Sequence, residues 1–211
     1  TKAFKDMVAV TASVEHSLKE INVLLNLSTK DLQGFSKELF GVAKNTASSF
    51  ATVTTAATEF SRQGLSAAET AKRVNNALIL TRLSGLDAEA SVSALTAAVN
   101  GFKSEAITTT EVVNRLANVD AKFAVSSADL AKALSRAGAV STDAKVKFNE
   151  LVAATTAVQQ ATARGGNVIG NGFKTIFTRL QRSKVRQELE KIGVATTTST
   201  GSIRGAIDVL T

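Results

Sequence analysis

One glycine-rich stretch of the chain combines residue types that could bind a phosphate. The segment GGNVIGNGFKTIFTRLQR, residues 165–182, places four glycines before a lysine and a threonine at the start of a helical pattern. A P-loop needs a glycine directly before that lysine, because only a residue without Cβ lets the backbone N–H groups surround the phosphate. Phe173 occupies that position, and Thr175 occupies the third glycine position of a dinucleotide fingerprint. The stretch therefore does not predict a nucleotide site, and its glycines need another explanation.

The single histidine is the other candidate for catalysis. His16 shares a predicted helix face with Ser13 and Glu20, which are the residue types of a hydrolytic triad. A triad needs its base oriented inside a pocket that excludes water, whereas this face is the exposed flank of a predicted helix. The chain has no cysteine, so thiol catalysis and thiolate metal sites are excluded. We therefore predict a protein that is not an enzyme and that binds no cofactor, metal or small-molecule substrate.

The composition predicts an almost wholly helical chain. The 211 residues include no proline, a residue that breaks helices and commonly marks turns and edge strands. The formal net charge of +7 is compatible with an anionic partner but identifies none. A solvated basic face is the simpler interpretation, because the ten phenylalanines follow helical spacing among aliphatic residues instead of forming a base-stacking surface. The longest uncharged runs are too short and too rich in Thr, Ser and Gln to span a bilayer.

A seam of mainly apolar residues, interrupted by four hydroxyl residues, runs through residues 4–60 at alternating steps of three and four. This spacing is typical of a coiled coil, and as one helix the segment would extend about 85 Å at 1.5 Å per residue. An apolar face of that length must be covered by other copies of the chain or by a long partner helix. The predicted oligomer seam comprises Phe4, Met7, Val14, Leu18, Ile21, Leu25, Leu32, Phe35, Leu39, Val42, Val53 and Phe60.

Two features argue against one continuous helix in this segment. The sequence STKD at residues 28–31 resembles a capping box, and Gly34 and Gly41 each weaken a helix by about 1 kcal/mol relative to alanine. The heptad register survives both features, and a helical hairpin would have no reason to keep it across a turn. We therefore expect one long helix, or two helices nearly in line, and we prefer this to a hairpin.

After residue 62 the pattern changes to short amphipathic helices joined by tight turns. Capping patterns predict helix starts near Ser66, Asp87, Thr110, Ser127 and Thr142, with further helices near 173–182 and 184–192. This succession suits a compact helical bundle. We expect an all-α protein with a long N-terminal coiled-coil helix in residues 1–62, a compact bundle of short helices in 63–193, and a linker with the start of a further helix in 194–211.

The helix after the glycines has two different faces. An apolar face is formed by Phe173, Ile176, Phe177 and Leu180, and a basic stripe on the other side by Arg179, Arg182 and Arg186. Beyond Ser183 the apolar residues are rotated by roughly 130°, which predicts a break there or a second partner. Gly166 and Gly170 form a small-x-x-x-small pair that suits a tight helix contact. The basic stripe is then either solvated surface or a docking site.

Three longer blocks resemble the core region of tailed-bacteriophage tape measure proteins. They are ALILTRLSGLDAEASVSALTAAVNGF, NRLANVDAKFAVSSADLAKALSRAG and GNVIGNGFKTIFTRLQR, and with their surroundings they cover roughly residues 65–193. The resemblance implies a structural protein present in several copies inside the tail tube, which fixes tube length during assembly and leaves ahead of the genome at infection. It also implies a homotrimer, with a hexamer as the alternative, and contacts with tail tube and tail tip or baseplate proteins.

The same resemblance implies assembly in the host cytoplasm and contact with the host membrane or DNA during ejection. Family members are much longer, with a repetitive middle, so we expect this chain to be a piece that does not itself act as the ruler. Two rivals share parts of the pattern. A bacterial signalling coiled coil of the chemoreceptor type would continue its heptads past residue 62, and a membrane-active helical toxin would make liposomes leak.

Overall fold

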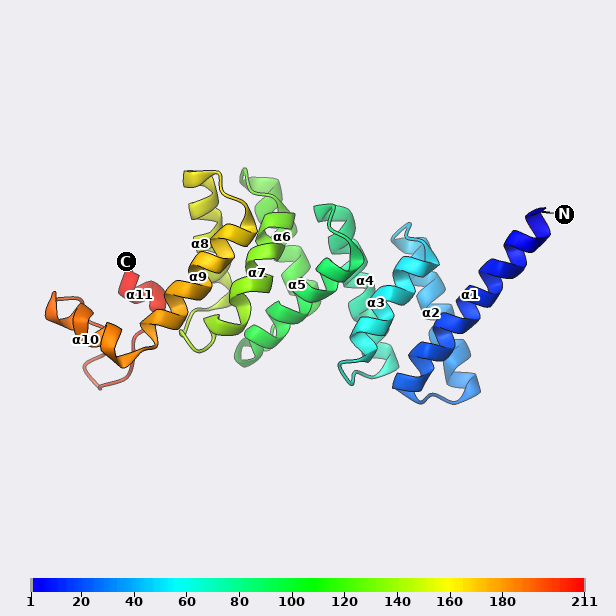
Figure 1. Ribbon diagram of the computed structural model, residues 1–211, viewed down its shortest axis with the longest axis horizontal. Helices are drawn as coiled ribbons and strands as arrows, with labels where there is room; N and C mark the ends of the chain where they lie inside the picture. Colours follow the sequence, from blue (N-terminus) through cyan, green and yellow to red (C-terminus); the bar gives the residue numbers. More distant parts are fainter. Residues whose placement is uncertain (1, 211) are drawn as a thin grey trace. The chain divides into compact units, whose positions relative to one another are not determined.

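The computed structural model describes residues 2–210, and for residues 2–11 it describes the backbone alone. Of the chain, 76% is helical, which confirms the predicted all-α class. The helices form two compact units, residues 1–92 and 93–211. Figure 1 shows the succession of helices from α1 to α11. The boundary between the units falls inside α5 (Ala88–Gly101), whereas the sequence patterns placed divisions near residues 62 and 193.

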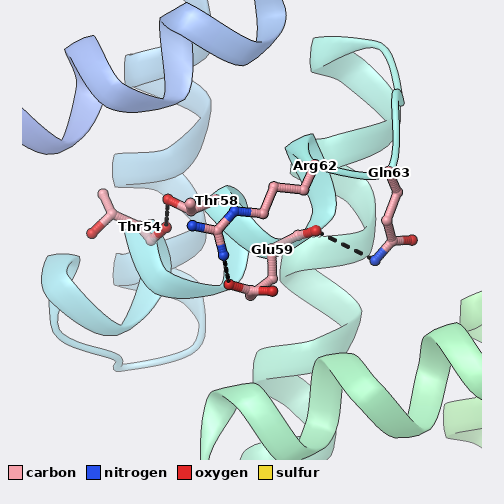
Figure 2. A network of polar contacts seen from close by, with 5 residues as sticks. All are labelled: Thr54, Thr58, Glu59, Arg62 and Gln63. Atoms are coloured by element: carbon pink, nitrogen blue, oxygen red, sulfur yellow. Dashed lines mark hydrogen bonds and ion pairs between the residues drawn. The ribbon is translucent and has the colours of Figure 1, made fainter.

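The first unit contains α1 (Lys2–Leu25), α2 (Thr29–Asn45), α3 (Phe50–Ser61) and α4 (Ala67–Ser84). Because α4 packs against both α2 and α3, the chain makes a joint core across residue 62. The turn after α3 is held by local contacts, which Figure 2 shows: Arg62 pairs with the Glu59 carboxylate, and the Gln63 side chain donates to the Glu59 carbonyl at 3.4 Å. Gly64 closes this turn with a φ of 72°.

The single long helix predicted for residues 4–60 is not formed, because the chain turns twice within it. The Asn22 side chain ends α1 by accepting a hydrogen bond from the Leu27 N–H at 2.8 Å, and Asn26 has a φ of 50°. Ser28 then caps α2, since its hydroxyl accepts from the Asp31 N–H. A second turn at 46–49 ends with Ser49 as the N-cap of α3. The capping pattern at residues 28–31 was therefore the stronger indication.

The heptad register survived these turns for a simple reason. The residues between α1 and α2 number three, at 26–28, and those between α2 and α3 number four, at 46–49. The seam positions that fall in these linkers are Ser28, Thr46 and Ser49, so the count continued through both turns without an apolar residue in either. The register therefore did not distinguish a continuous helix from a folded one.

The second unit consists of most of α5 and the elements that follow it. They are the 3-10 turn η1 (Lys103–Glu105), α6 (Thr109–Lys122), α7 (Ser127–Ser141), α8 (Phe148–Thr162), α9 (Gly166–Leu180), α10 (Ser183–Lys191) and α11 (Ala206–Leu210). Helix α7 packs against α6, α8 and α9, and Figure 1 shows it among them. Its buried side chains include Leu130 and Leu134, each 1% exposed. The core of this unit therefore forms around α7.

Most predicted helix starts agree with the structure. The N-terminus of α6 has a complete capping box, in which Thr108 accepts from the Glu111 N–H and the Glu111 carboxylate accepts from the Thr108 N–H. These hydrogen bonds, first from the Thr108 backbone and then from its hydroxyl, lower the pKa of Glu111. The start predicted at Thr142 is wrong: residues 142–147 form a turn in which Lys145 has a φ of 53°, and Glu150 accepts from the Lys147 N–H to cap α8.

The segment after α10 was predicted to be a linker, but it is folded back onto the second unit. Thr196 is 1% exposed, and its hydroxyl donates to the Glu190 carboxylate. The Ala206 N–H donates to the Ala144 carbonyl at 2.8 Å, which fixes the start of α11 beside the turn that precedes α8. The predicted further helix is present as α11, while the preceding residues contribute to packing.

Candidate functional site

The close contact between α7 and α9 explains the glycine-rich stretch. A Cβ added at Gly166 would lie closer than 3.0 Å to the Asp129 carbonyl oxygen, and one at Gly170 would lie 2.8 Å from the Ala133 Cα. Real Cβ atoms almost never approach this closely, so only glycine fits both positions. The predicted small-x-x-x-small contact is therefore confirmed, and α7 is the helix against which it packs.

The other two blocks supply a second contact of the same kind. A Cβ at Gly101, the last residue of α5, would lie closer than 3.0 Å to the Gly138 carbonyl of α7, and a Cβ at Gly138 would lie 3.0 Å from the Ala97 carbonyl. Sequence reasoning did not identify Gly101 or Gly138 as contact residues. An isolated glycine inside a helical pattern such as that of α7 commonly has a packing reason, and this was the available indication.

A carboxylate of the chain occupies the place where a phosphate would bind at the start of α9. Asp129, in the first turn of α7, accepts hydrogen bonds from the Gly166 N–H at 2.7 Å, the Gln159 amide at 2.7 Å and the Ser126 hydroxyl at 3.0 Å. Burial raises the pKa of Asp129, but these hydrogen bonds and the Lys132 charge outweigh it and lower the pKa. The N-terminus of α9 thus has its anion supplied internally, which agrees with the absence of a P-loop pattern.

The predicted packing and docking helix divides into a buried face and an exposed one. Phe173 is 8% exposed and Phe177 is fully buried, with their rings stacked at a centroid distance of 5.5 Å. Leu180 is half-buried, but Ile176 is 39% exposed and lies outside this contact. The helix ends at Leu180 and α10 begins at Ser183, as the rotated apolar pattern indicated.

The predicted basic stripe is formed only in part. Arg179 and Arg182 are exposed on α9 and just after it. Arg186 lies on α10 and turns back, so that its guanidinium donates to the carbonyls of Leu180 at 3.4 Å and Gln181 at 2.5 Å. Because these carbonyls are at the C-terminal end of α9, Arg186 caps that helix and is not free for a partner.

The predicted oligomer seam mostly forms the core of the first unit. Six of its residues are buried there: Ile21, Phe35, Leu39, Val42, Val53 and Phe60. Another four are half-buried: Val14, Leu18, Leu25 and Leu32. Phe4 and Met7 lie outside the residues whose side chains are described. The buried residues are thus covered by neighbouring helices among α1 to α4 of the same chain, where the sequence pattern predicted other copies.

An apolar groove nevertheless remains between α1 and α2. It has a volume of about 390 Å³ and is lined by residues that include Leu18, Leu32 and Phe40. Phe40 is 48% exposed and stacks on Phe50 at a centroid distance of 4.1 Å. Sequence reasoning assigned Leu18 and Leu32 to the seam but did not use Phe40, which lies next to the seam residue Leu39.

The polar groups considered for catalysis are exposed or occupied. His16 and Glu20 lie 3.4 Å apart with side chains that are 75% and 62% exposed, and Ser13 is also exposed. A second cleft of about 390 Å³, in the second unit, is lined by residues that include Glu105 and Glu111. Glu105 accepts from the Phe148 N–H at 2.9 Å, and Glu111 belongs to the capping box of α6. Both carboxylates of this cleft therefore cap helices.

Among the described side chains, those of residues 12–210, there is no group of three or more His, Cys, Asp or Glu placed to hold a metal ion. Among the helices of the same residues, none has the length and apolar character needed to cross a membrane.

The chain is an all-α protein whose helices meet at close glycine contacts. The carboxylates of Glu105, Glu111 and Asp129 accept hydrogen bonds from backbone N–H groups at helix N-termini. Residues 29–211 match the family described as phage-related minor tail protein, and the chain belongs to this family. The membership gives the chain a structural role in a phage tail and a place in the tail of the virion. No solved structure matches the chain.

Proposed function

We propose that the chain is part of a tail tape measure protein, which lies in the lumen of the tail tube, directs tube assembly and length, and leaves at genome ejection. The family membership supports a role in the tail, and the finer assignment rests on the three blocks that resemble tape measure cores. One structural observation supports it. The glycines of these blocks, Gly101, Gly138, Gly166 and Gly170, make the contacts of α5 and α9 with α7.

This observation matters because it connects the resemblance to one folded feature. Blocks that are separated along the sequence carry residues that meet at close helix contacts, where no larger side chain fits. A resemblance confined to such positions would reflect a shared helical arrangement. We infer that most of the second unit, together with residues 65–92 of the first, is the folded core that the resemblance describes, and that this core serves assembly and contacts without measuring length.

The location inside the tube is tested by protease protection. Intact tails are treated with a protease too large to enter the tube, and the chain is followed with an antibody before and after ejection is triggered. A protein of the lumen is resistant in intact tails and becomes sensitive once released, while an external tail protein, used as the control, is cleaved in both. Cleavage of the chain in intact tails would place it outside the lumen and refute the proposal.

The copy number is a second part of the proposal. We propose several copies per tail, as a homotrimer or alternatively a hexamer, with contacts to tube and tip or baseplate proteins. The half-buried seam residues Leu18 and Leu32 and the exposed ring of Phe40 leave an apolar groove that could take part in such contacts. Mass measurement of purified tails counts the copies directly. A single copy per tail would contradict this part while leaving the lumen location intact.

The family membership favours the tail role over both rivals. A signalling coiled coil would continue its heptads past residue 62, but α3 ends at Ser61 and short helices follow. A membrane-active toxin is separated from the proposal by one assay: the purified chain is mixed with dye-loaded liposomes, and dye release above the level of a buffer control would favour the toxin.

A further inference from the structure

The positive charge of the chain is concentrated around α9. Between Glu150 and Glu188 the sequence contains no acidic residue. The same interval contains six basic residues, at positions 164, 174, 179, 182, 184 and 186. Since the formal net charge of the whole chain is +7, the remaining residues together contribute 7 − 6 = +1. Most of the net positive charge of the chain is therefore located in one segment of the second unit.

Five of these six side chains remain available to a partner. Arg186 caps α9, but the exposed residues at 164, 174, 179, 182 and 184 form none of the ion pairs found among the described residues. The acids that follow in sequence are engaged locally, because Glu188 pairs with Lys191 and Glu190 accepts from Thr196. The five charges are consequently not neutralised by ion pairs within the described chain.

The surface that carries these charges is held on a fixed helix. The glycines of α9 lock its inner side against α7, and Phe173 and Phe177 fill the same side. At 3.6 residues per turn, Lys174 and Arg179 lie about 140° apart around α9, and both side chains are exposed. Arg182 and Lys184 follow after α9 has ended at Leu180. The four cations between residues 174 and 184 therefore lie along the C-terminal half of α9 and at the start of α10.

The chemistry around the cations favours a phosphate backbone as the partner. Thr178 and Gln181 lie beside Lys174 and Arg182, and hydroxyl and amide side chains of this kind accompany Arg and Lys in phosphate contacts. The two aromatic rings of α9 are buried, so bases cannot stack on them as they do in proteins that grip single strands. A protein partner would instead be expected to bury a desolvated apolar centre among the charges. Two large exposed apolar side chains, Val168 and Ile176, lie on α9, but none of those in the described residues lies between residues 177 and 191, the part that holds Arg179, Arg182 and Lys184.

We propose that the outer face of α9 binds double-stranded DNA through its phosphates and without reading the base sequence. A duplex carries about one negative charge per 1.7 Å of axis, so a cationic row on a helix can contact several phosphates at once. The proposal does not depend on the position of the chain in the tail tube. It concerns only the described surface of the second unit.

The test measures the affinity of the full chain for a fluorescent duplex of about 30 base pairs by anisotropy, at salt concentrations from about 50 to 200 mM. If five cations contact phosphates, the slope of log K against log salt is about −4.5, which corresponds to about a 500-fold loss of affinity over this range. The variant Lys174→Gln, Arg179→Gln, Arg182→Gln keeps two of the five, so its slope falls to about −2. Duplexes of different sequence bind equally.

A charge-matched control separates this face from general attraction. Lys30, Lys37 and Lys72 are exposed in the first unit, and changing all three to Gln lowers the net charge by the same amount. This control keeps the wild-type slope if the face of α9 binds the duplex. Equal loss in both triple variants, or no binding of the wild type at the lowest salt, would overturn the proposal. Polyglutamate is also added as a competitor at the same total charge as unlabelled duplex. If it displaces the labelled duplex as effectively as unlabelled duplex does, the partner is an acidic protein and the proposal is overturned. Circular dichroism and melting of each variant confirm that the fold is retained.

Discussion

The contact between α7 and α9 makes Gly166→Ala a demanding test of the structure. The added methyl group would lie closer than 3.0 Å to the carbonyl oxygen, carbonyl carbon and Cα of Asp129, which are all backbone atoms. Backbone atoms cannot rotate away as a flexible side chain can, so α9 must shift relative to α7. The shift also lengthens the hydrogen bond from the Gly166 N–H to the Asp129 carboxylate, which is 2.7 Å in the native protein.

The expected cost follows from these two effects. Overpacking a close contact costs about 1–3 kcal/mol. A hydrogen bond to a charged group contributes about 1.5–3 kcal/mol, and the shift removes part or all of it. Alanine has an intrinsic helix advantage of at most about 1 kcal/mol over glycine, which offsets only a fraction of the loss. We expect the free energy of unfolding of the second unit to fall by about 2–5 kcal/mol.

The matched control is Gly172→Ala on the same helix. A Cβ at Gly172 has no atom within 4 Å, so the same chemical change meets open space. We expect this variant to gain about 1 kcal/mol from helix propensity. Urea unfolding followed by circular dichroism gives both values. If the two variants differ in stability by less than about 0.5 kcal/mol, the α7–α9 contact is not as close as described and the reasoning is refuted.

Two further predictions concern single groups, and a third concerns enzymatic activity. Because the folded-state pKa of Asp129 is lowered, its carboxylate stabilises the fold above its ordinary pKa, and this contribution disappears as the pH falls through the folded-state pKa. The difference in unfolding free energy between wild type and Asp129→Asn should therefore shrink on acidification below about pH 4. A difference that stays constant in acid titrations would contradict this. Arg186→Gln should lower the free energy of unfolding by about 0.5–1.5 kcal/mol, since it removes the cap of α9. The control Arg179→Gln should change it by less than about 0.5 kcal/mol. Equal effects of the two variants in urea unfolding would contradict the capping role of Arg186. Nuclease, protease and ATPase assays of the purified chain should give background rates, and turnover abolished by a point mutation would contradict this.

The helical class and the α9 contact were predictable because they depend on local spacing. The absence of proline and the regular capping patterns predict helices wherever a hydroxyl or Asp precedes an apolar run. Gly166 and Gly170 stand one turn apart, so their shared face could be derived without knowing the partner helix. What the sequence lacked was the identity of that partner, because Asp129 and Ala133 are separated from the glycines by the whole of α8.

The error over residues 4–60 has a different origin. An apolar stripe shows that a helix face is covered, but it does not say whether another copy or the same chain covers it. In the first unit the helices α1 to α4 pack on one another and bury six of the residues from Ile21 to Phe60 that the seam assigned to other copies. The interaction that decides between these arrangements is the one at Asn22, whose side chain ends α1, and asparagine in a helical pattern gives little indication of this role.

The two surfaces of α9 have opposite requirements, and this explains why one short segment holds such different residues. The inner side must approach α7 so closely that glycine is needed at Gly166 and Gly170, and a helix with several glycines is intrinsically weak. That weakness is offset by Asp129 at the N-terminus of α9 and by Arg186 at its C-terminus, since each charge complements the helix dipole at its end. With both ends capped by the chain itself, Lys174, Arg179 and Arg182 are not needed to hold the helix in place. Replacing them should therefore alter what the protein binds while leaving its stability nearly unchanged, which is why the charge variants can report on a partner and the glycine variants on the fold.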